Sequence, residues 1–184
     1  MHLIGPALSL LSIIITTAFT VTADPSPTPL SCLRAGMAEV AGPGISGTFH
    51  FRLFGNEKEV MTLVNFQVHG LQNNKKYPYH IHESPIDNTD CQSAKGHFNP
   101  TKSILVGKCT KDKRASCETG DLAGKFGPLV GTGTTVTGRY VDSSLVMKQT
   151  SLGILGRSIV IHDGETGARL ACGTIKANPN RLGC

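Results

Sequence analysis

The chain has 184 residues, with 18 Lys and Arg against 13 Asp and Glu and a formal net charge of +5 at pH 7. This length suits one domain with a hydrophobic core, and the basic excess fits either a solvated surface or an anionic partner. The single dense basic run, from Lys108 to Arg114, has no interleaved aromatic residues, which argues against a nucleic-acid site.

The first segment, residues 1–23, is predicted to be a signal peptide. An apolar run from Leu8 to Phe19 is followed by small residues where a signal peptidase would cut. A membrane anchor is the alternative, but the run is short for a span and leads directly into the Pro-rich segment 24–33. The tail, 177–184, lacks the hydrophobic stretch of a lipid-anchor signal. We therefore expect a secreted protein with no membrane anchor in the mature chain.

The rest of the chain reads as one all-β domain without an internal repeat. Short alternating or apolar runs are broken by turn residues, and no segment has convincing helical spacing. Residues 83–133 show no clean strand pattern, and so long a stretch without regular structure is often functional. The expected strands, in chain order, are 35–40, 47–53, 61–68, 79–82, 135–141, 157–162 and one near 170–176.

Four histidines stand out along these elements. His80 and His82 flank one residue in an extended segment, so both imidazoles point to the same face. Taken alone, such a pair is more often a surface feature than half of a metal site. His97 follows in a Gly-His-Phe-Asn-Pro turn, and His162 ends a strand-like run. The remaining histidines look ordinary: His2, His50 and His69.

The chain has six cysteines, which in a secreted protein of this size predict disulfides. The spacing alone leaves the pairing open. A cysteine zinc site is the rival interpretation, but the chain lacks a close Cys-x-x-Cys pair.

Six segments, in their order and largely in their spacing, resemble the copper/zinc superoxide dismutase family. The resemblance covers about residues 35–176 and predicts a superoxide dismutase domain over 34–176. It implies an eight-stranded antiparallel Greek-key sandwich or barrel of immunoglobulin-like type, with long disulfide-clipped loops and the metal on its outer face. The matching segments are Tyr79–Glu83, Cys91, Gly96–Pro100, Gly120–Leu122, Gly156–His162 and Arg169–Gly173.

The resemblance also implies the chemistry. One copper ion per chain would be held by His80, His82, His97 and His162, and would cycle between Cu(II) and Cu(I) while superoxide is converted to oxygen and hydrogen peroxide. An all-imidazole site suits copper, whereas zinc has no redox chemistry. His97 would release Cu(I) and carry a proton, and Arg169 would guide the incoming anion.

Two departures from the family pattern argue against zinc. No histidine lies between His97 and His162, where the family has further zinc ligands. Only seven positions separate His162 from Arg169, where relatives insert a long charged loop. Both features resemble the copper-only extracellular branch known from fungi and oomycetes. Without zinc, Asp121 is the expected partner of the distal nitrogen of His97, with Glu118 nearby; the alternative is a pair of solvated carboxylates.

The resemblance implies a Cys91–Cys172 disulfide. We further expect Cys109–Cys117 to pair within the shortened loop, and Cys32–Cys184 remains by elimination.

Two rival functions stay open: a non-catalytic secreted copper-binding or scavenging protein on the same fold, and an interaction protein that has lost its metal. The presence of Arg169 and Asp121 favours the enzyme over the first, and the retention of all four histidines disfavours the second. The expected substrate is superoxide. No nucleic-acid partner is expected, and among the oligomeric states the monomer is favoured.

Overall fold

The computed structural model describes residues 35–55, 60–104 and 109–178. The expected signal peptide (1–23), the Pro-rich segment (24–33), the Cys32–Cys184 pair and most of the tail (177–184) lie outside the described residues.

The described chain is mostly β-structure, with three short helical segments in the long connection between β5 and β7. Among the described residues, no helix reaches the length and apolarity that a membrane span requires. The elements in chain order are β1 (Ala35–Gly42), β2 (Ile45–Gly55), β3 (Val60–His69), β4 (Lys76–Tyr77), β5 (Tyr79–His82), the 3-10 helices η2 (Cys91–Ala94) and η3 (Lys111–Ser116), α1 (Leu122–Phe126), β6 (Leu129–Val130), β7 (Thr135–Asp142), β8 (Ser158–His162), β9 (Arg169–Thr174) and β10 (Lys176–Ala177).

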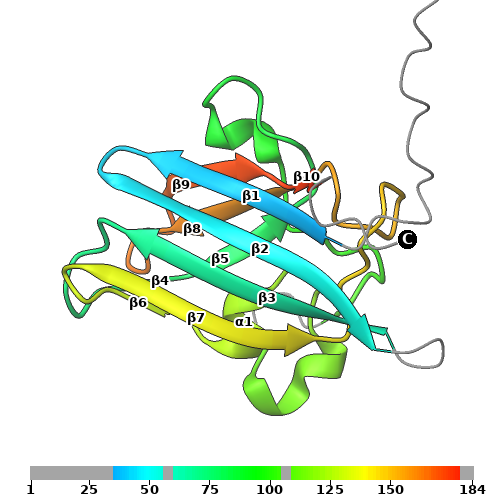
Figure 1. The fold of residues 1–184 in the computed structure, drawn as a ribbon. Helices are drawn as coiled ribbons and strands as arrows, with labels where there is room; N and C mark the ends of the chain where they lie inside the picture. The colour runs from blue at the N-terminus through cyan, green and yellow to red at the C-terminus, as the bar shows by residue number, and fades with distance from the viewer. Residues whose placement is uncertain (1–34, 56–59, 105–108, 179–184) are drawn as a thin grey trace, which may run out of the picture.

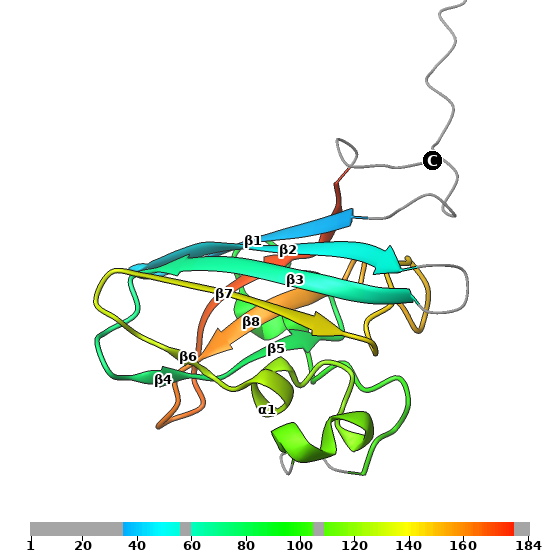
Figure 2. The same ribbon diagram turned by 60° about the horizontal axis from the view of Figure 1, so that its bottom comes forward.

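Eight strands form one antiparallel sheet in the order β5-β8-β9-β1-β2-β3-β7, with β10 paired to β1. The sheet curls, so that β5 and β8 lie opposite β2, β3 and β7 across the core (Figures 1 and 2). A separate two-stranded sheet joins β4 to β6. The expected fold class is confirmed, in the form of a half-barrel built from one curled sheet.

The core forms because side chains alternate between the two faces of each strand. On β2, Phe49 and Phe51 are buried while His50 between them is exposed. Opposite them, Tyr79 and Ile81 of β5 point inward, and Tyr79 packs with its ring centroid 5.7 Å from that of Phe49. The same alternation turns the histidines of β5 to the outer face of the sheet.

Strand β8 departs from this alternation because all five of its residues are buried. Its outer face is covered by the loop that contains η2, where Val160 packs with Ala94 and Cys172. The Cys91–Cys172 disulfide ties that loop to β9. Both sides of β8 are therefore packed, and its last residue, His162, lies in a rigid setting.

All seven strands expected from alternation are present, with no end shifted by more than two residues, and the last is split into β9 and β10. The pattern missed β4 and β6, which have two residues each, and α1, which has five. Elements of two to five residues are too short to show the repeating pattern of apolar and polar residues by which a strand or helix is predicted. Helix α1 instead begins at a side-chain cap, because Asp121 accepts a hydrogen bond from the Gly124 amide at 2.7 Å.

Candidate metal centre

The four histidines come together from three segments on the outer face of the sheet. His80 and His82 lie on β5, and His162 ends the neighbouring strand β8. His97 lies on the loop after η2, where it forms an isolated bridge with His82. The sequence-predicted ligand residues are thus brought together in space, with one potential ligand atom from each within 4.8 Å of the others.

Backbone hydrogen bonds hold the loop of His97 against β5. The Phe98 amide donates to the Ile81 carbonyl at 2.9 Å, and the Glu83 amide donates to the Gly96 carbonyl at 3.0 Å. Gly120 joins both segments, since its amide donates to Phe98 at 2.8 Å and its carbonyl accepts from Ile81 at 2.9 Å. A Cβ at Gly120 would lie 2.3 Å from the Ile81 oxygen, so only glycine permits this approach.

The hydrogen-bond partners determine which nitrogen of three imidazoles carries the hydrogen. Nδ1 of His82 lies 2.9 Å from the Lys95 carbonyl, and Nδ1 of His162 lies 3.1 Å from the Gly167 carbonyl. A carbonyl only accepts, so both Nδ1 atoms donate. Nδ1 of His97 faces the Glu118 carboxylate at 2.9 Å and donates likewise. In the neutral imidazoles, Nε2 of all three therefore presents a lone pair.

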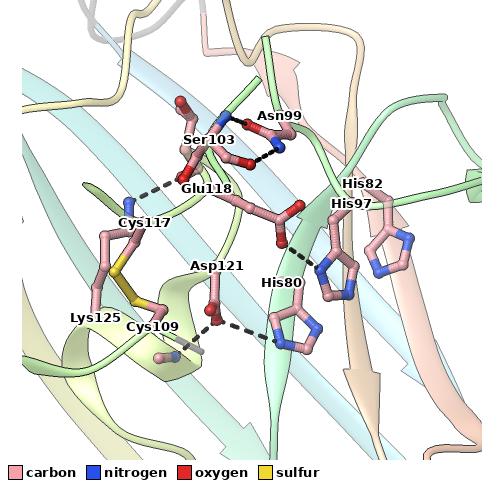
Figure 3. Close-up of polar contacts among 12 residues, drawn as sticks. His80, His82, His97, Asn99, Ser103, Cys109, Cys117, Glu118, Asp121 and Lys125 are labelled. Atoms are coloured by element: carbon pink, nitrogen blue, oxygen red, sulfur yellow. Dashed lines mark hydrogen bonds and ion pairs between the residues drawn. A yellow bond between two sulfur atoms is a disulfide. The ribbon is translucent and has the colours of Figure 1, made fainter. Parts of the chain in front are cut away.

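His80 is oriented the other way round. Its Nε2 lies 3.5 Å from Asp121 Oδ1, a contact that Figure 3 marks with a dashed line. Its buried Nδ1 has no hydrogen-bond partner. A buried polar atom without a partner is costly in an ordinary interior and calls for an explanation. A metal ligand explains it, because the Nδ1 lone pair of His80 faces the same space as the Nε2 atoms of the other three histidines.

The donor set fits a metal ion. Nε2 of His82 and Nε2 of His162 are 3.2 Å apart, yet both are acceptors, so no hydrogen bond joins them. A cation between such lone pairs would stabilise the arrangement. Four imidazole nitrogens without a carboxylate or thiolate suit copper, zinc, iron or nickel, and an all-nitrogen tetragonal site is typical of Cu(II).

Burial favours the neutral form of three of these imidazoles, those of His80, His82 and His162. Desolvation, followed by the proximity of His97, lowers the pKa of His80 to about 2. Desolvation also lowers the pKa of His82 to about 3, against the opposing hydrogen bond to Lys95, and the pKa of His162 falls for the same main reason. Neutral imidazole is the form that binds a metal, so the site is prepared for metal near neutral pH.

These shifts predict that the metal-free protein loses stability in mild acid. Unfolded histidine has a pKa near 6.5, above the folded values of His80 and His82. Below that pH the unfolded chain binds more protons, so stability falls by about 1.4 kcal/mol per pH unit for each of the two groups. Urea unfolding of chelator-treated protein between about pH 7 and pH 5 measures the slope. Replacing both histidines with alanine should make the slope shallower, with the contribution of His162 remaining; a flat profile in the unmodified chain would contradict the expectation.

Arg169 lies beside the histidines at the start of β9. A bulge in the β8–β9 pairing sets it opposite His162. Its guanidinium donates to the Cys91 carbonyl at 2.7 Å and to the Lys95 carbonyl, the same oxygen that accepts from His82. The charge of Arg169 also helps to lower the pKa of His82 and His162. The disulfide loop thus holds both a histidine and the neighbouring cation.

The two carboxylates are divided between two histidines. Sequence reasoning expected Asp121 beside His97, but Glu118 occupies that position and Asp121 faces His80 (Figure 3). The reason is local, because the Asp121 side chain caps α1 and is turned toward β5. Both carboxylates are buried, with side-chain exposures of 4% and 8%, so neither is a solvated loop charge.

Sequence reasoning missed two participants that act through the backbone. Lys95, with a φ of 63°, presents its carbonyl to both His82 and Arg169. Gly167 presents its carbonyl to His162. A backbone acceptor leaves no trace in residue type, and the available signals were only Gly96 and the Gly-rich turn before Arg169.

The structure contains the Cys91–Cys172 and Cys109–Cys117 disulfides, with sequence separations of 81 and 8 residues. The first anchors η2 to β9, and the second closes the loop of η3 just before Glu118.

Comparisons with known proteins agree with this geometry. Residues 45–175 match the copper/zinc superoxide dismutase family. The chain is 36% identical over 101 residues to the cell surface Cu-only superoxide dismutase 5 of Candida albicans, covering 54% of this chain and 41% of that protein. It is 31% identical over 175 residues to the cell surface superoxide dismutase [Cu-Zn] 4 of the same organism, covering 90% of this chain and 70% of the relative.

A solved structure of Candida albicans superoxide dismutase 5 with Cu(II) superposes with a TM-score of 0.69 at 29% identity, covering 82% of this chain and 95% of that one. The family match spans most of the chain, including all four histidines. The chain therefore belongs to the copper/zinc superoxide dismutase family.

Proposed function

We propose that the chain is a secreted superoxide dismutase that works with one copper ion and without zinc. The observation that carries the proposal is the convergence of four imidazole lone pairs within 4.8 Å, with a fixed guanidinium beside them. His80 would bind copper through Nδ1, and His82, His97 and His162 would bind it through Nε2. Bound copper would supply one-electron chemistry between Cu(II) and Cu(I), by which two superoxide anions and two protons become oxygen and hydrogen peroxide.

The chain's own residues would hold the substrate and move protons. Arg169 keeps its guanidinium beside His162 by donating to backbone carbonyls, which leaves its positive charge available to attract a small anion. The His97 side chain is 31% exposed against 13% for His80, and His82 and His162 are buried, so His97 is the most accessible of the four imidazoles. Whenever Nε2 of His97 is not bound to copper, that atom could therefore take up a proton from solvent, while Glu118 holds Nδ1–H.

Replacing Arg169 with alanine is expected to lower kcat/KM for superoxide by roughly 10-fold, because the fixed charge that concentrates the anion is lost. The copper content should stay at that of the unmodified protein. Rates measured at low and high salt check the cause, since added salt should slow the original protein more than the variant. Equal rates for the two proteins at low salt would show that Arg169 does not guide the substrate.

The proposal that zinc is absent rests on the chain's donors. No histidine occurs between His97 and His162 in the sequence, and the nitrogens of His97 and His80 that face away from the metal site already have carboxylate neighbours. Glu118 and Asp121 would orient these ligands and raise their basicity, which is the usual role of carboxylates behind metal-bound histidines.

Glu118→Gln keeps the size of the side chain but removes its charge. Because neighbours of this kind are typically worth 10- to 100-fold in affinity or activity, we expect about that loss in copper affinity. Competition with a copper chelator measures it. Glu165→Gln, at an exposed residue of the turn before Arg169, is the matched control and should behave like the original chain. An unchanged affinity for Glu118→Gln would refute the orienting role.

Secretion is proposed from the N-terminal sequence and from the relatives described as cell-surface proteins. The monomer remains our expectation for its assembly. Recovery of the mature chain from the medium of expressing cells, followed by N-terminal sequencing, tests cleavage after residue 23.

A non-catalytic copper-binding protein is the second candidate, since the four histidines alone would suffice for it. Protein loaded with copper and protein loaded with zinc distinguish the two in a superoxide-decay assay. We expect fast decay with copper and buffer-like decay with zinc, because zinc has no redox chemistry. Buffer-like decay with both metals would favour the copper-binding alternative.

A further inference from the structure

Lys125 is a charged residue in an unusual place. It lies on α1 and its side chain is only 2% exposed. Its ammonium donates three hydrogen bonds: to the Thr119 carbonyl at 2.8 Å, to Asp142 Oδ2 at 2.5 Å and to Ser144 Oγ at 3.0 Å. All three donor positions of the ammonium are used, so the group is fixed in direction.

Asp142, the ion-pair partner of Lys125, is itself held by hydrogen bonds. Asp142 ends β7 and is itself 3% exposed at the side chain. Its second oxygen accepts from the Ser144 amide at 2.8 Å and from the Ser144 hydroxyl at 2.6 Å. Lys125 is thereby anchored to the edge of the main sheet.

On its other side Lys125 is bonded to the segment 118–121, which carries the two carboxylates Glu118 and Asp121. Thr119, whose carbonyl accepts from Lys125, lies between Glu118 and Asp121. Those two face His97 and His80 respectively. Gly120 ties the same segment to β5 through the Ile81 amide. The segment is therefore held on one side by β5 and on the other by Lys125.

Stability alone does not account for a buried ion pair. Replacing such a pair with apolar residues of similar volume is often neutral or stabilising, because burial of two charges costs as much as their attraction returns. The pair is bonded through Thr119 to the segment that carries both carboxylates of the metal centre, so it is in a position to fix their placement.

We propose that Lys125, anchored by Asp142, is a positioning residue that holds Glu118 and Asp121 against His97 and His80. The buried ammonium of Lys125 would thus fix the segment 118–121 on the side away from β5. The inference deepens the proposed function, since it concerns the ligands of the copper centre and rests on that assignment.

The test uses the copper-loaded full chain and a balanced apolar replacement, Lys125→Met with Asp142→Leu. Removing both charges leaves neither one buried and unpaired, so we expect the variant to fold, with stability lowered only by the contacts that Thr119 and Ser144 lose. We expect amide hydrogen exchange over residues 118–121 to rise by at least about 10-fold, because the Thr119 anchor is gone. The Cu(II) electron paramagnetic resonance spectrum should change as the two ligand histidines lose their fixed orientation.

Two further variants make the result decisive. Val64→Ala, in the core of β3, should lower stability while leaving the exchange of 118–121 and the copper spectrum unchanged. Ser144→Ala removes one contact of Lys125 at an exposed residue, and should raise the same exchange by a smaller factor. It also serves as the test if the double replacement fails to fold.

The proposal is overturned if the double variant keeps both the amide exchange rate of residues 118–121 and the copper spectrum of the unmodified protein. If the double variant does not fold, an unchanged exchange rate of these residues in Ser144→Ala overturns it instead. A failure of the proposed function looks different: the copper-loaded original chain would be inactive toward superoxide, while the exchange and the copper spectrum still responded to Lys125→Met with Asp142→Leu.

Discussion

Replacing His80 with alanine is expected to remove copper from the chain and to reduce superoxide decay to the rate of buffer. His80 offers a buried imidazole nitrogen, its Nδ1, that has no hydrogen-bond partner among the described residues. Without it, three imidazoles remain, one of them partly open to solvent at His97. Metal analysis of dialysed protein, together with the decay assay, measures both effects.

The matched control is His50→Ala. His50 is exposed and lies on β2, which is separated from β5 by three strands in the order of the sheet. This variant should keep one copper per chain and the original rate. If His80→Ala kept its copper and its rate, or if His50→Ala lost them equally, the four-histidine site would be the wrong assignment.

The second large effect is expected from the Cys91–Cys172 disulfide. Its sequence separation of 81 residues means that opening it frees a long loop in the unfolded chain, worth about 4.5 kcal/mol in the chain-entropy model. The Cys109–Cys117 disulfide, with a separation of 8, is worth about 2.5 kcal/mol by the same argument. Urea unfolding of the two double-alanine variants compares these losses directly.

Removal of the Cys91–Cys172 disulfide should also affect the site at temperatures where the chain stays folded. The Cys91 carbonyl accepts from Arg169, and the same loop supplies the Lys95 carbonyl to His82. Activity should therefore fall more than the folded fraction does. Equal losses of stability from the two disulfides, or activity that follows the folded fraction alone, would contradict this description of the loop.

The sequence predicted the sheet well because each strand of the core alternates clearly, as Phe49, His50 and Phe51 illustrate. It could not predict the connection between β5 and β7 in the same way. There the order comes from particular contacts, such as the Asp121 cap of α1 and the Gly120 bridge, rather than from a repeating pattern. Such contacts depend on segments that meet only after folding.

The site shows the same division. The four histidines that the structure brings together could be named from the resemblance to the family, because the resemblance is carried by residue types in short motifs. The partner of His97 could not, since Glu118 and Asp121 are three positions apart and only the start of α1 decides which one reaches it. Lys125 gave no signal at all, because a lysine in a polar loop reads as an exposed charge until its burial is seen.

The central claim is that one copper in the four-histidine site suffices for superoxide dismutation. Copper-free protein should be titrated with Cu(II) while the rate of superoxide decay and the bound metal are measured together, with and without added zinc. The rate of superoxide decay should rise linearly up to one copper per chain and then stay constant. Added zinc should not change it. One bound copper with a buffer-like rate, or activity that appears only when zinc is added, would contradict the account.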